Sequence, residues 1–465
     1  MSLLLSFYGD DFTGSTDAME ALALAGVPTV LFLGLPTAEW QRRFPGVRAM
    51  GIAGSSRAMT PEEMGAHLPP VFEQLRGWGA PIVHYKVCST FDSSPEVGSI
   101  GRALELGREA FGRHPVPIVV GAPVLGRYCV FGNLFARSGL DSEPFRLDRH
   151  PTMSRHPVTP MRESDLRYHL AEQFSERVNP TEAVALFDVL RLAEPEPAQD
   201  RHWAALWERR PRALLLDTLY PEHLLAVGRL LFQEAERSGP LLVVGSSGVE
   251  YALTTYWRAS GTLPESLSRP VAEPVDRIVV LSGSCSPVTD RQVGTALTEG
   301  FEEIPLETPL LVDPATEGKT LQAAATAAVS FLRKGRSVVL HTARGPNDLR
   351  IEQTRDRLAA HGLPPHRAAE LLGRALGRLA RAILEAEPVR RWVVTGGDTS
   401  YYTAQELGLR ALTMLAPIAP GSPICRAYAD DSSVDGLEIL FKGGQVGWAE
   451  LLGDIRAGRP RFRHG

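Results

Sequence analysis

Short apolar runs that end in small or polar residues recur along the whole chain. They are SLLLSFYGDDF (2–12), PIVHYKVCSTF (81–91), PIVVGAPVLG (117–126), ALLLDTL (213–219), LLVVGSSGVEYAL (241–253), RIVVLSGSCSPVT (277–289), SVVLHTARG (337–345) and RWVVTGGDTSYY (391–402). Val, Ile and Leu follow one another in these runs without polar alternation, which is typical of strands buried on both faces of a sheet. Helical patterns lie between the runs. The sequence therefore predicts an α/β protein with largely parallel sheets flanked by helices.

A change in composition divides this pattern into two parts. The stretch GTLPESLSRPVAEPVD (261–276) carries three prolines among polar residues. We expect an N-terminal domain at 1–262, a linker at 263–276 and a C-terminal domain at 277–465, in line with roughly 100–200 residues per domain. Residues 141–165 have little apolar periodicity and are rich in Pro, Arg and His, and long irregular segments of this kind are often functional or mobile.

Composition narrows the class of protein. Of the 465 residues, 44% are hydrophobic, and the net charge of −5 is spread without a basic stripe of the kind that binds nucleic acid. The four cysteines are far apart and indicate neither a zinc site nor a disulfide framework. No run approaches the roughly 20 apolar residues of a membrane span. We expect a soluble cytoplasmic enzyme or small-molecule binder, with no nucleic-acid or membrane partner. The sequence leaves the oligomeric state open and is compatible with a homo-oligomer.

Two adjacent carboxylates, Asp10 and Asp11, stand at the end of the first apolar run, in LLSFYGDDFTGSTDA (4–18). A single Asp here favours helix capping, because the free N–H groups and the dipole of a helix N-terminus attract an acidic side chain. Capping does not explain two acids in a row at a strand tip. One of them can cap while the other faces a cleft as a base or a magnesium ligand.

The run that ends near residue 91 carries a second group of candidates in HYKVCSTFDSS (84–94). Lys86, Ser89, Thr90 and Asp92 offer a cation, hydroxyls and a further carboxylate, which suit a polyhydroxylated anionic molecule but also an ordinary Ser/Thr-rich turn. Arg127 adds a guanidinium that can clamp a carboxylate through two parallel bonds, although an Arg after a Gly is more often a surface residue.

Three glycine-rich loops lie in the C-terminal half. Two of them, LSGSCSPVTDRQV (281–293) and VVTGGDTSYYTAQELG (393–408), have the order strand, small residues, helix; the third is FKGGQVG (441–447). Glycines let backbone N–H groups approach an anion closely, and the following helix N-terminus favours phosphate. Tight turns alone also produce this pattern, but three such loops in one domain favour a nucleotide. DPATEGKT (313–320) is not a Walker A loop, because Asp313 stands where Gly is needed. No GxGxxG follows a strand, which argues against a dinucleotide fold.

Several motifs together resemble the four-carbon acid sugar kinases. They are DDFTGSTD (10–17), YKVCSTFDSS (85–94), SGSCSPVTDRQV (282–293), GGDTS (396–400), APGSP (419–423) and FKGGQVG (441–447). They occur in the family's order over nearly the whole chain. CSTFDSS (88–94), with HPVTPM (156–161), is most similar to the 3-oxo-tetronate kinase branch. The Asp-Ser-Thr-Leu-Arg-Gly sequence typical of the threonate and erythronate branches is absent, and GSSR (54–57) differs from the turn usual in the 3-oxo-tetronate branch.

The resemblance implies an N-terminal domain that binds a four-carbon sugar acid, a C-terminal domain that binds ATP, and phosphoryl transfer to a terminal hydroxyl in the cleft between them. It implies ATP contacts by Ser284, Gly396, Gly397, Asp398, Thr399, Gly443 and Gly444. We expect Arg57, Lys86, Ser89, Thr90, Asp92 and Arg127 around the substrate. Phosphoryl transfer needs a group that receives the hydroxyl proton. Asp11 is the preferred base, Asp10 its partner or replacement, and Asp92 the next candidate. Asp398 beside the phosphates suggests Mg²⁺.

Three hypotheses follow. The first is an ATP- and Mg²⁺-dependent kinase of a four-carbon sugar acid, 3-oxo-tetronate first, with threonate or erythronate as alternatives. The second is a dehydrogenase or aldolase that acts on similar acids; the missing dinucleotide fingerprint and the lack of a metal-ligand cluster argue against it. The third is a non-catalytic sugar-acid sensor, which would need no phosphate loops.

Overall fold

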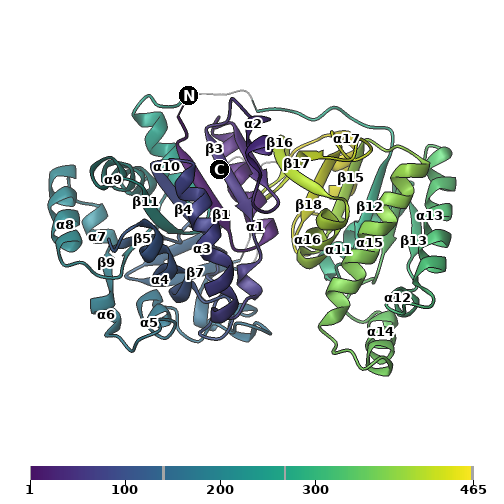
Figure 1. Cartoon of the computed structure of the whole chain (residues 1–465), viewed down its shortest axis with the longest axis horizontal. Helices are drawn as coiled ribbons and strands as arrows, with labels where there is room; N and C mark the ends of the chain where they lie inside the picture. The colour runs from purple at the N-terminus through teal and green to yellow at the C-terminus, as the bar shows by residue number, and fades with distance from the viewer. Residues whose placement is uncertain (1, 139–141, 266–268, 462–465) are drawn as a thin grey trace. The chain divides into compact units, whose positions relative to one another are not determined.

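The computed structural model describes residues 2–138, 142–265 and 269–461 (Figure 1). The chain forms two compact units, one of Met1–Thr29 with Thr37–Leu267 and one of Val30–Pro36 with Ser268–Gly465. The segment 30–36 thus belongs to the second unit, although it lies early in the sequence. Within the described residues, no helix combines the length and the apolar character needed to cross a membrane.

The first unit contains a seven-stranded parallel sheet in the order β3-β1-β4-β11-β5-β10-β9. Its strands are β1 (Leu5–Gly9), β3 (Ala49–Ala53), β4 (Ile82–Lys86), β5 (Val116–Val119), β9 (Val184–Phe187), β10 (Ala213–Leu216) and β11 (Leu241–Gly245). All but one residue of these strands are buried, as the continuous apolar runs predict. A small antiparallel sheet, β6 (Arg127–Val130), β7 (Asn133–Arg137) and β8 (Pro144–Arg146), is added beside it.

The first unit has ten α-helices within its described residues, and most of them flank its large sheet (Figure 1). They are α1 (Phe12–Leu24), α2 (Ala38–Arg42), α3 (Pro61–Gly77), α4 (Ile100–Phe111), α5 (Leu166–Ala171), α6 (Pro180–Ala183), α7 (Val189–Leu192), α8 (Glu196–Glu208), α9 (His223–Ser238) and α10 (Gly248–Ala259). Phe72 of α3 and Leu104 of α4 lie in one apolar core with Tyr8, Tyr85 and Ile118 of the strands. Residue 141 of the segment predicted to be irregular, 141–165, lies outside the described residues, and the described part, 142–165, contains β8 and two single 3₁₀ turns at Leu147–Arg149 and Met153–Arg155.

The second unit has a mixed sheet in the order β13-β14-β12-β15-β18-β17-β16-β2. The strands are β2 (Thr29–Phe32), β12 (Ile278–Ser282), β13 (Glu302–Pro305), β14 (Val338–His341), β15 (Arg391–Thr395), β16 (Leu409–Ala419), β17 (Ser422–Ala429) and β18 (Glu438–Lys442). The five from β13 to β18 in this order are parallel, and β17, β16 and β2 continue the sheet in antiparallel pairs. Leu31 and Phe32 of β2 pair with β16.

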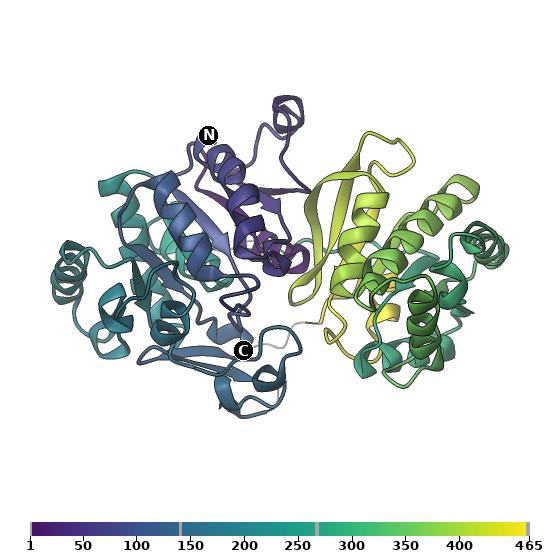
Figure 2. The ribbon, with the colours of Figure 1, turned by 60° about the horizontal axis from the view of Figure 1, so that its bottom comes forward.

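The helices of the second unit are α11 (Pro287–Thr298), α12 (Thr308–Leu311), α13 (Glu317–Arg333), α14 (Leu349–Ala360), α15 (Arg367–Ala386), α16 (Gly397–Glu406) and α17 (Leu451–Ala457). They flank the sheet of the unit, as both views show (Figures 1 and 2). The prediction of an α/β protein with largely parallel sheets flanked by helices is confirmed. In each unit the carboxyl ends of the parallel strands meet at one edge, and the predicted site residues follow those ends.

Candidate active site

The register of three parallel strands gathers the first group of site residues. Gly9 at the end of β1 pairs with Ala53 of β3 on one side and with Lys86 of β4 on the other. The backbone continues this pairing, because Asp10 N donates to the Lys86 carbonyl at 2.9 Å and Arg57 N donates to the Asp10 carbonyl at 3.0 Å. Asp10, Asp11, Arg57, Lys86 and Asp17 of α1 form what we call the acidic cluster.

Asp11 caps α1 and is also the more accessible of the two adjacent carboxylates. Its side chain accepts hydrogen bonds from Gly14 N at 3.1 Å and from Thr13 Oγ1 at 2.8 Å, and it is 24% exposed. A Cβ at Gly14 would lie 2.3 Å from Asp11 Oδ1, so glycine is what lets the carboxylate lie against the helix start. The sequence predicts capping by one of the two aspartates and a cleft-facing role for the other; in the structure Asp11 both caps the helix and is partly exposed.

Arg57 holds both carboxylates with one guanidinium. Its Nη2 lies 2.7 Å from Asp10 Oδ1 and 2.8 Å from Asp11 Oδ1, and its Nε donates to Asp10 Oδ2 at 3.3 Å. Burial raises the pKa of Asp10 to about 6 despite the opposing effect of Arg57. For Asp11 burial also acts upward, but Arg57 and Lys86 outweigh it and lower the pKa. At neutral pH Asp11 is therefore ionised and able to accept a proton.

Lys86 is buried, and carboxylates of the same unit balance its charge. Its Nζ donates to the Val87 carbonyl at 3.1 Å and lies 3.5 Å from Asp17 Oδ2. Burial alone would lower the pKa of Lys86, but Asp17 and Asp11 raise it above the ordinary value. Asp17 is a residue that the sequence analysis missed. It stands within a helical pattern, where an acidic residue is typical of a solvated face.

The loop after β4 brings two of the predicted residues, Thr90 and Asp92, into one chain of contacts with Cys88. Thr90 Oγ1 donates to Asp92 Oδ1 at 2.7 Å and lies 3.0 Å from the Cys88 sulfur. Buried Phe91 between them has φ 57°, a left-handed conformation that costs free energy in a bulky residue and recurs at functional sites. Burial, with Asp92 nearby, raises the pKa of Cys88 to about 11, so the thiol is protonated at neutral pH. Ser89 is partly exposed in the same loop.

Arg127 opens β6 and has no carboxylate partner among the described residues. Its Nη1 donates to the carbonyl oxygens of Leu125 at 3.1 Å and of Arg137 at 3.1 Å. Burial lowers its pKa, with Cys88 and Asp92 opposing that change. A partly buried guanidinium that only carbonyl groups satisfy is suited to receive an anion.

The three glycine-rich loops of the second unit follow neighbouring parallel strands, β12, β15 and β18. Gly283 N donates to the Thr395 carbonyl at 3.0 Å, and Gly396 N donates to the Lys442 carbonyl at 2.9 Å, so each loop begins beside the next strand end. The structure thus brings together all the residues predicted to contact ATP, namely Ser284, Gly396, Gly397, Asp398, Thr399, Gly443 and Gly444. We call this group, with Lys442, the glycine-loop site.

Backbone conformation explains one of these glycines, and close packing between the loops explains another. Gly396 has φ 111°, and a Cβ at Gly444 would lie 2.4 Å from Ser284 Oγ. Gly397 differs, because a Cβ there would meet nothing within 4 Å. Asp398 is exposed in the first turn of α16. The described residues contain no group of three or more His, Cys, Asp or Glu side chains suited to a metal.

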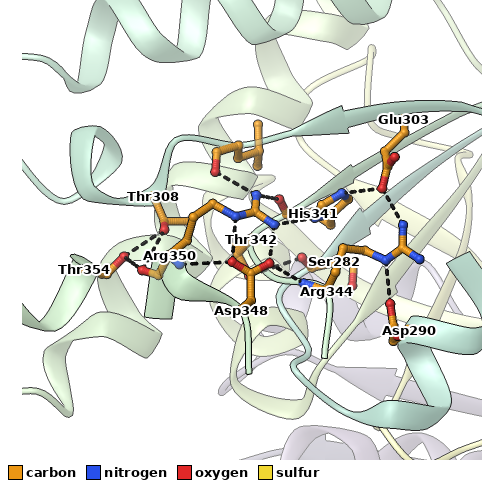
Figure 3. A network of polar contacts seen from close by, with 11 residues as sticks. Ser282, Asp290, Glu303, Thr308, His341, Thr342, Arg344, Asp348, Arg350 and Thr354 are labelled. Atoms are coloured by element: carbon orange, nitrogen blue, oxygen red, sulfur yellow. Dashed lines mark hydrogen bonds and ion pairs between the residues drawn. The ribbon is translucent and has the colours of Figure 1, made fainter. Parts of the chain in front are cut away.

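A polar network at the ends of β13 and β14 fixes the segment that follows β14 (Figure 3). Arg344 donates to Asp290 Oδ1 and to Glu303 Oε1, both at 2.5 Å, while Arg350 pairs with Asp348 at 2.6 Å. His341 Nδ1 faces Arg350 Nη2 at 3.1 Å, so this nitrogen accepts and the ring is neutral. Asp290 lies in the first turn of α11, so the network anchors the helix behind the loop of Ser284. The sequence predicts the end of β14 but not this network.

Comparison with known proteins identifies the class of protein that this fold and these sites define. The sequence matches the family models "Sugar-binding N-terminal domain" over residues 5–253 and "Nucleotide-binding C-terminal domain" over residues 279–452. It is 47% identical to the 3-oxo-isoapionate kinase of Paraburkholderia graminis, over 98% of this chain and 95% of the relative. It is 30% identical to the 3-oxo-tetronate kinase of Methylobacterium radiotolerans, over 97% and 98% of the two chains.

Solved structures agree with this fold. A crystal structure from Salmonella typhimurium LT2, provisionally described as a tRNA synthase, superposes with a TM-score of 0.76 at 26% identity and covers 98% of both chains. Haemophilus influenzae protein HI1011 has the same fold, with a TM-score of 0.69 over 96% of this chain and 98% of that one. The chain belongs to the four-carbon acid sugar kinase family. It is a phosphotransferase that acts on a sugar acid, which argues against the dehydrogenase, aldolase and sensor hypotheses.

Proposed function

We propose that the protein transfers the γ-phosphoryl group of ATP to a hydroxyl of a 3-oxo sugar acid. The observation that carries this proposal is the ionised, partly exposed Asp11 carboxylate, fixed by Arg57 and the start of α1 in the domain that matches a sugar-binding model. Phosphoryl transfer depends mainly on positioning and charge, and an aspartate beside the acceptor hydroxyl supplies the one proton acceptor it needs.

In this proposal the acceptor binds around the loop after β4 and the start of β6. Arg127 receives the substrate carboxylate, since its guanidinium has no acidic partner, whereas Lys86 is already paired with Asp17. Ser89, Thr90 and Asp92 supply hydrogen bonds to the hydroxyl groups of the sugar acid. We infer 3-oxo-isoapionate as the first substrate to test, because the relative of that name shares 47% identity, against 30% for the named 3-oxo-tetronate kinase.

The nucleotide binds at the glycine-loop site. Backbone N–H groups of the loops after β12, β15 and β18 and the hydroxyls of Ser284 and Thr399 face its phosphates. Mg²⁺ fits this site as an ion held mainly by the phosphates, with Asp398 as its single protein carboxylate, which is a common arrangement for this ion. When bound, it would neutralise charge on the phosphate oxygens.

The reaction balances without a further reactant. The acceptor oxygen forms a bond to the γ-phosphorus while the bond from that phosphorus to the β,γ-bridging oxygen breaks, which releases ADP. The hydroxyl proton passes to Asp11. Arg57 keeps that carboxylate oriented, and its charge keeps the carboxylate ionised before the transfer.

The direct test is ADP release measured with a coupled assay on the full-length protein. The acceptors are 3-oxo-isoapionate, 3-oxo-tetronate, threonate and erythronate, each with ATP and Mg²⁺. We expect turnover with at least one of the 3-oxo acids and a kcat/KM for threonate and erythronate that is lower by tenfold or more. Turnover restricted to threonate or erythronate would overturn the substrate assignment, and the absence of acceptor-dependent ADP release with all four would overturn the proposed reaction.

A further inference from the structure

Lys442, the last residue of β18, is a fully buried lysine at the centre of the glycine-loop site. Its relative exposure is 0%, and it immediately precedes Gly443 and Gly444. Its backbone carbonyl accepts the hydrogen bond from Gly396 N, so it also adjoins the loop after β15. A buried lysine in this position has to be accounted for, because it costs free energy to move an ammonium group out of water.

No carboxylate balances this charge. Among the described residues, none forms an ion pair with Lys442, whereas most buried charges in proteins are paired. The Nζ atom donates to two oxygen atoms, Thr289 Oγ1 at 3.3 Å and the Gly443 carbonyl at 3.1 Å. Burial lowers the pKa of Lys442 to about 8, and no acidic group opposes that change. The fold therefore tolerates a cation here without compensating it.

The contacts of Lys442 show what the ammonium group acts on. Thr289 Oγ1 donates in turn to the Gly444 carbonyl at 2.8 Å, so both glycine carbonyl oxygens of this loop are held from inside the protein. A carbonyl oxygen turned outward would repel a phosphate oxygen. Gly444 also lies against Ser284 of the loop after β12, so the ammonium group stands where the two loops meet.

We propose that Lys442 is the fixed positive charge of the nucleotide site, a positioning residue that attracts the phosphates from behind the Gly443–Gly444 loop and keeps the carbonyl oxygens of that loop turned away from them. This inference rests on the proposed use of ATP. Lys442 touches neither the phosphates nor the reacting atoms. In this proposal the bound nucleotide supplies the negative charge that balances Lys442.

The test compares ligands that differ in their number of phosphates. Dissociation constants for adenosine, AMP, ADP and ATP are measured calorimetrically on the full-length wild type and on Lys442→Met and Lys442→Gln. Met removes the charge and the hydrogen bonds, whereas Gln keeps a donor for Thr289 and Gly443 and removes only the charge. Lys319→Met serves as the control, because Lys319 is exposed on α13 and its loss changes the net charge of the unit equally.

We expect both Lys442 variants to weaken ATP binding about tenfold or more, the scale of one charge acting on several others at an effective dielectric near 20. The loss decreases from ATP to ADP to AMP, adenosine stays within twofold, and Lys319→Met binds like the wild type. An equal loss for all four ligands, or full recovery of ATP binding in Lys442→Gln, would show a purely structural role and overturn the inference. A wild type that binds no nucleotide would instead overturn the proposed function, and this inference with it.

Discussion

Each unit has a buried lysine at the end of a parallel strand, but the two units balance the charge of this lysine differently. Lys86 ends β4 and Lys442 ends β18, and each donates from Nζ to the carbonyl of the next residue at 3.1 Å. Lys86 lies 3.5 Å from Asp17, and its pKa is raised; Lys442 has no such partner in the described part of the chain, and burial lowers its pKa to about 8. The first lysine completes a set of charges within the protein, whereas the second leaves a charge for a ligand to complete.

The acidic cluster and the glycine-loop site differ in the same sense. In the acidic cluster, Arg57 and Lys86 lie close to three aspartates. The folded protein therefore already orients a carboxylate that can accept a proton. In the glycine-loop site, backbone groups and one unbalanced cation create a region suited to an anion. Variants that remove one residue from the acidic cluster or from the glycine-loop site should distinguish a site whose charges are balanced within the protein from one that leaves a charge for a ligand.

The largest effect should come from Lys86→Met. It leaves Asp17 without its partner, and breaking a largely buried ion pair costs about 3–5 kcal/mol of the free energy of unfolding. Lys442→Met should cost less than about 1 kcal/mol, since Thr289 keeps its bond to Gly444 and no carboxylate is left alone. Urea unfolding of both variants and of the double variant Lys86→Met/Asp17→Asn measures the contrast. Equal losses in the two single variants would contradict the comparison.

The next effect concerns the proton acceptor. Asp11→Asn keeps the size of the side chain and its bond with Gly14 N but removes the carboxylate, so kcat should fall by about 100-fold or more. The melting temperature and ATP affinity should stay near those of the wild type. Asp188→Asn, which alters another aspartate cap at α7, is the matched control and should leave kcat unchanged. A tenfold smaller effect for Asp11→Asn than for Asp10→Asn would exchange the roles of the two residues.

Arg127→Met should lower kcat/KM for the sugar acid by about 10- to 100-fold, corresponding to a lost charge-assisted bond of roughly 1.5–3 kcal/mol. The KM for ATP should not change, since Arg127 belongs to the first unit. Arg146→Met removes a guanidinium of the same small sheet that is already paired with Asp148, and it should leave kcat/KM unaffected. If Arg127→Met keeps full activity, the substrate carboxylate binds elsewhere.

The pH dependence of stability should identify Asp10. Its folded pKa of about 6 lies above the unfolded value, so the folded state holds this proton longer. Its contribution is therefore fully present below the unfolded pKa and is lost as the pH rises through 6. Between pH 4.5 and 7.5 we expect wild type to lose about 2 kcal/mol relative to Asp10→Asn, measured by urea unfolding. Parallel curves for the two proteins would show that Asp10 is ionised over the whole range.

The smallest effect is expected for Gly397→Val. A side chain there meets open space, so stability should hardly change, but it occupies the region that we assign to the nucleotide phosphates. The KM for ATP should rise about tenfold, close to 1.4 kcal/mol, while the KM for the sugar acid stays constant. Gly318→Val, also in open space but on α13, should change neither constant. An unchanged KM for ATP in a folded Gly397→Val would place the phosphates elsewhere.

The sequence predicts most reliably those strands in which one physical signal, burial on both faces of the sheet, dominates. Strands such as β1, β12 and β15 are buried on both faces, and their continuous apolar runs reveal them directly. Ala49–Ala53 forms the equally buried β3, but its run AMGIA has a single β-branched residue among Ala, Gly and Met and does not stand out in the sequence. The long antiparallel pair of β16 and β17 was missed for a similar reason, since its partly buried residues alternate irregularly.

The sequence predicts those residues of the candidate site that lie at the ends of recognisable strands. Asp10, Lys86 and the glycine loops follow recognisable strands, so their meeting at one sheet edge follows from the parallel order. Which charges balance one another could not be predicted. Asp17 reaches Lys86 only because α1 folds back across the end of β4, and nothing in FKGGQVG (441–447) reveals that no acid reaches Lys442. Such pairings depend on distances between elements far apart in the chain.

The place of β2 has a practical consequence for any attempt to take the protein apart. Residues 30–36 lie in the second unit, and Leu31 and Phe32 pair there with β16. A fragment cut at the linker would therefore keep this buried apolar strand but lose β16, with which Leu31 and Phe32 pair, and an exposed strand edge of this kind invites aggregation. Coexpressing the two halves, so that the second half can capture the strand as they fold, should yield soluble protein where either half alone precipitates.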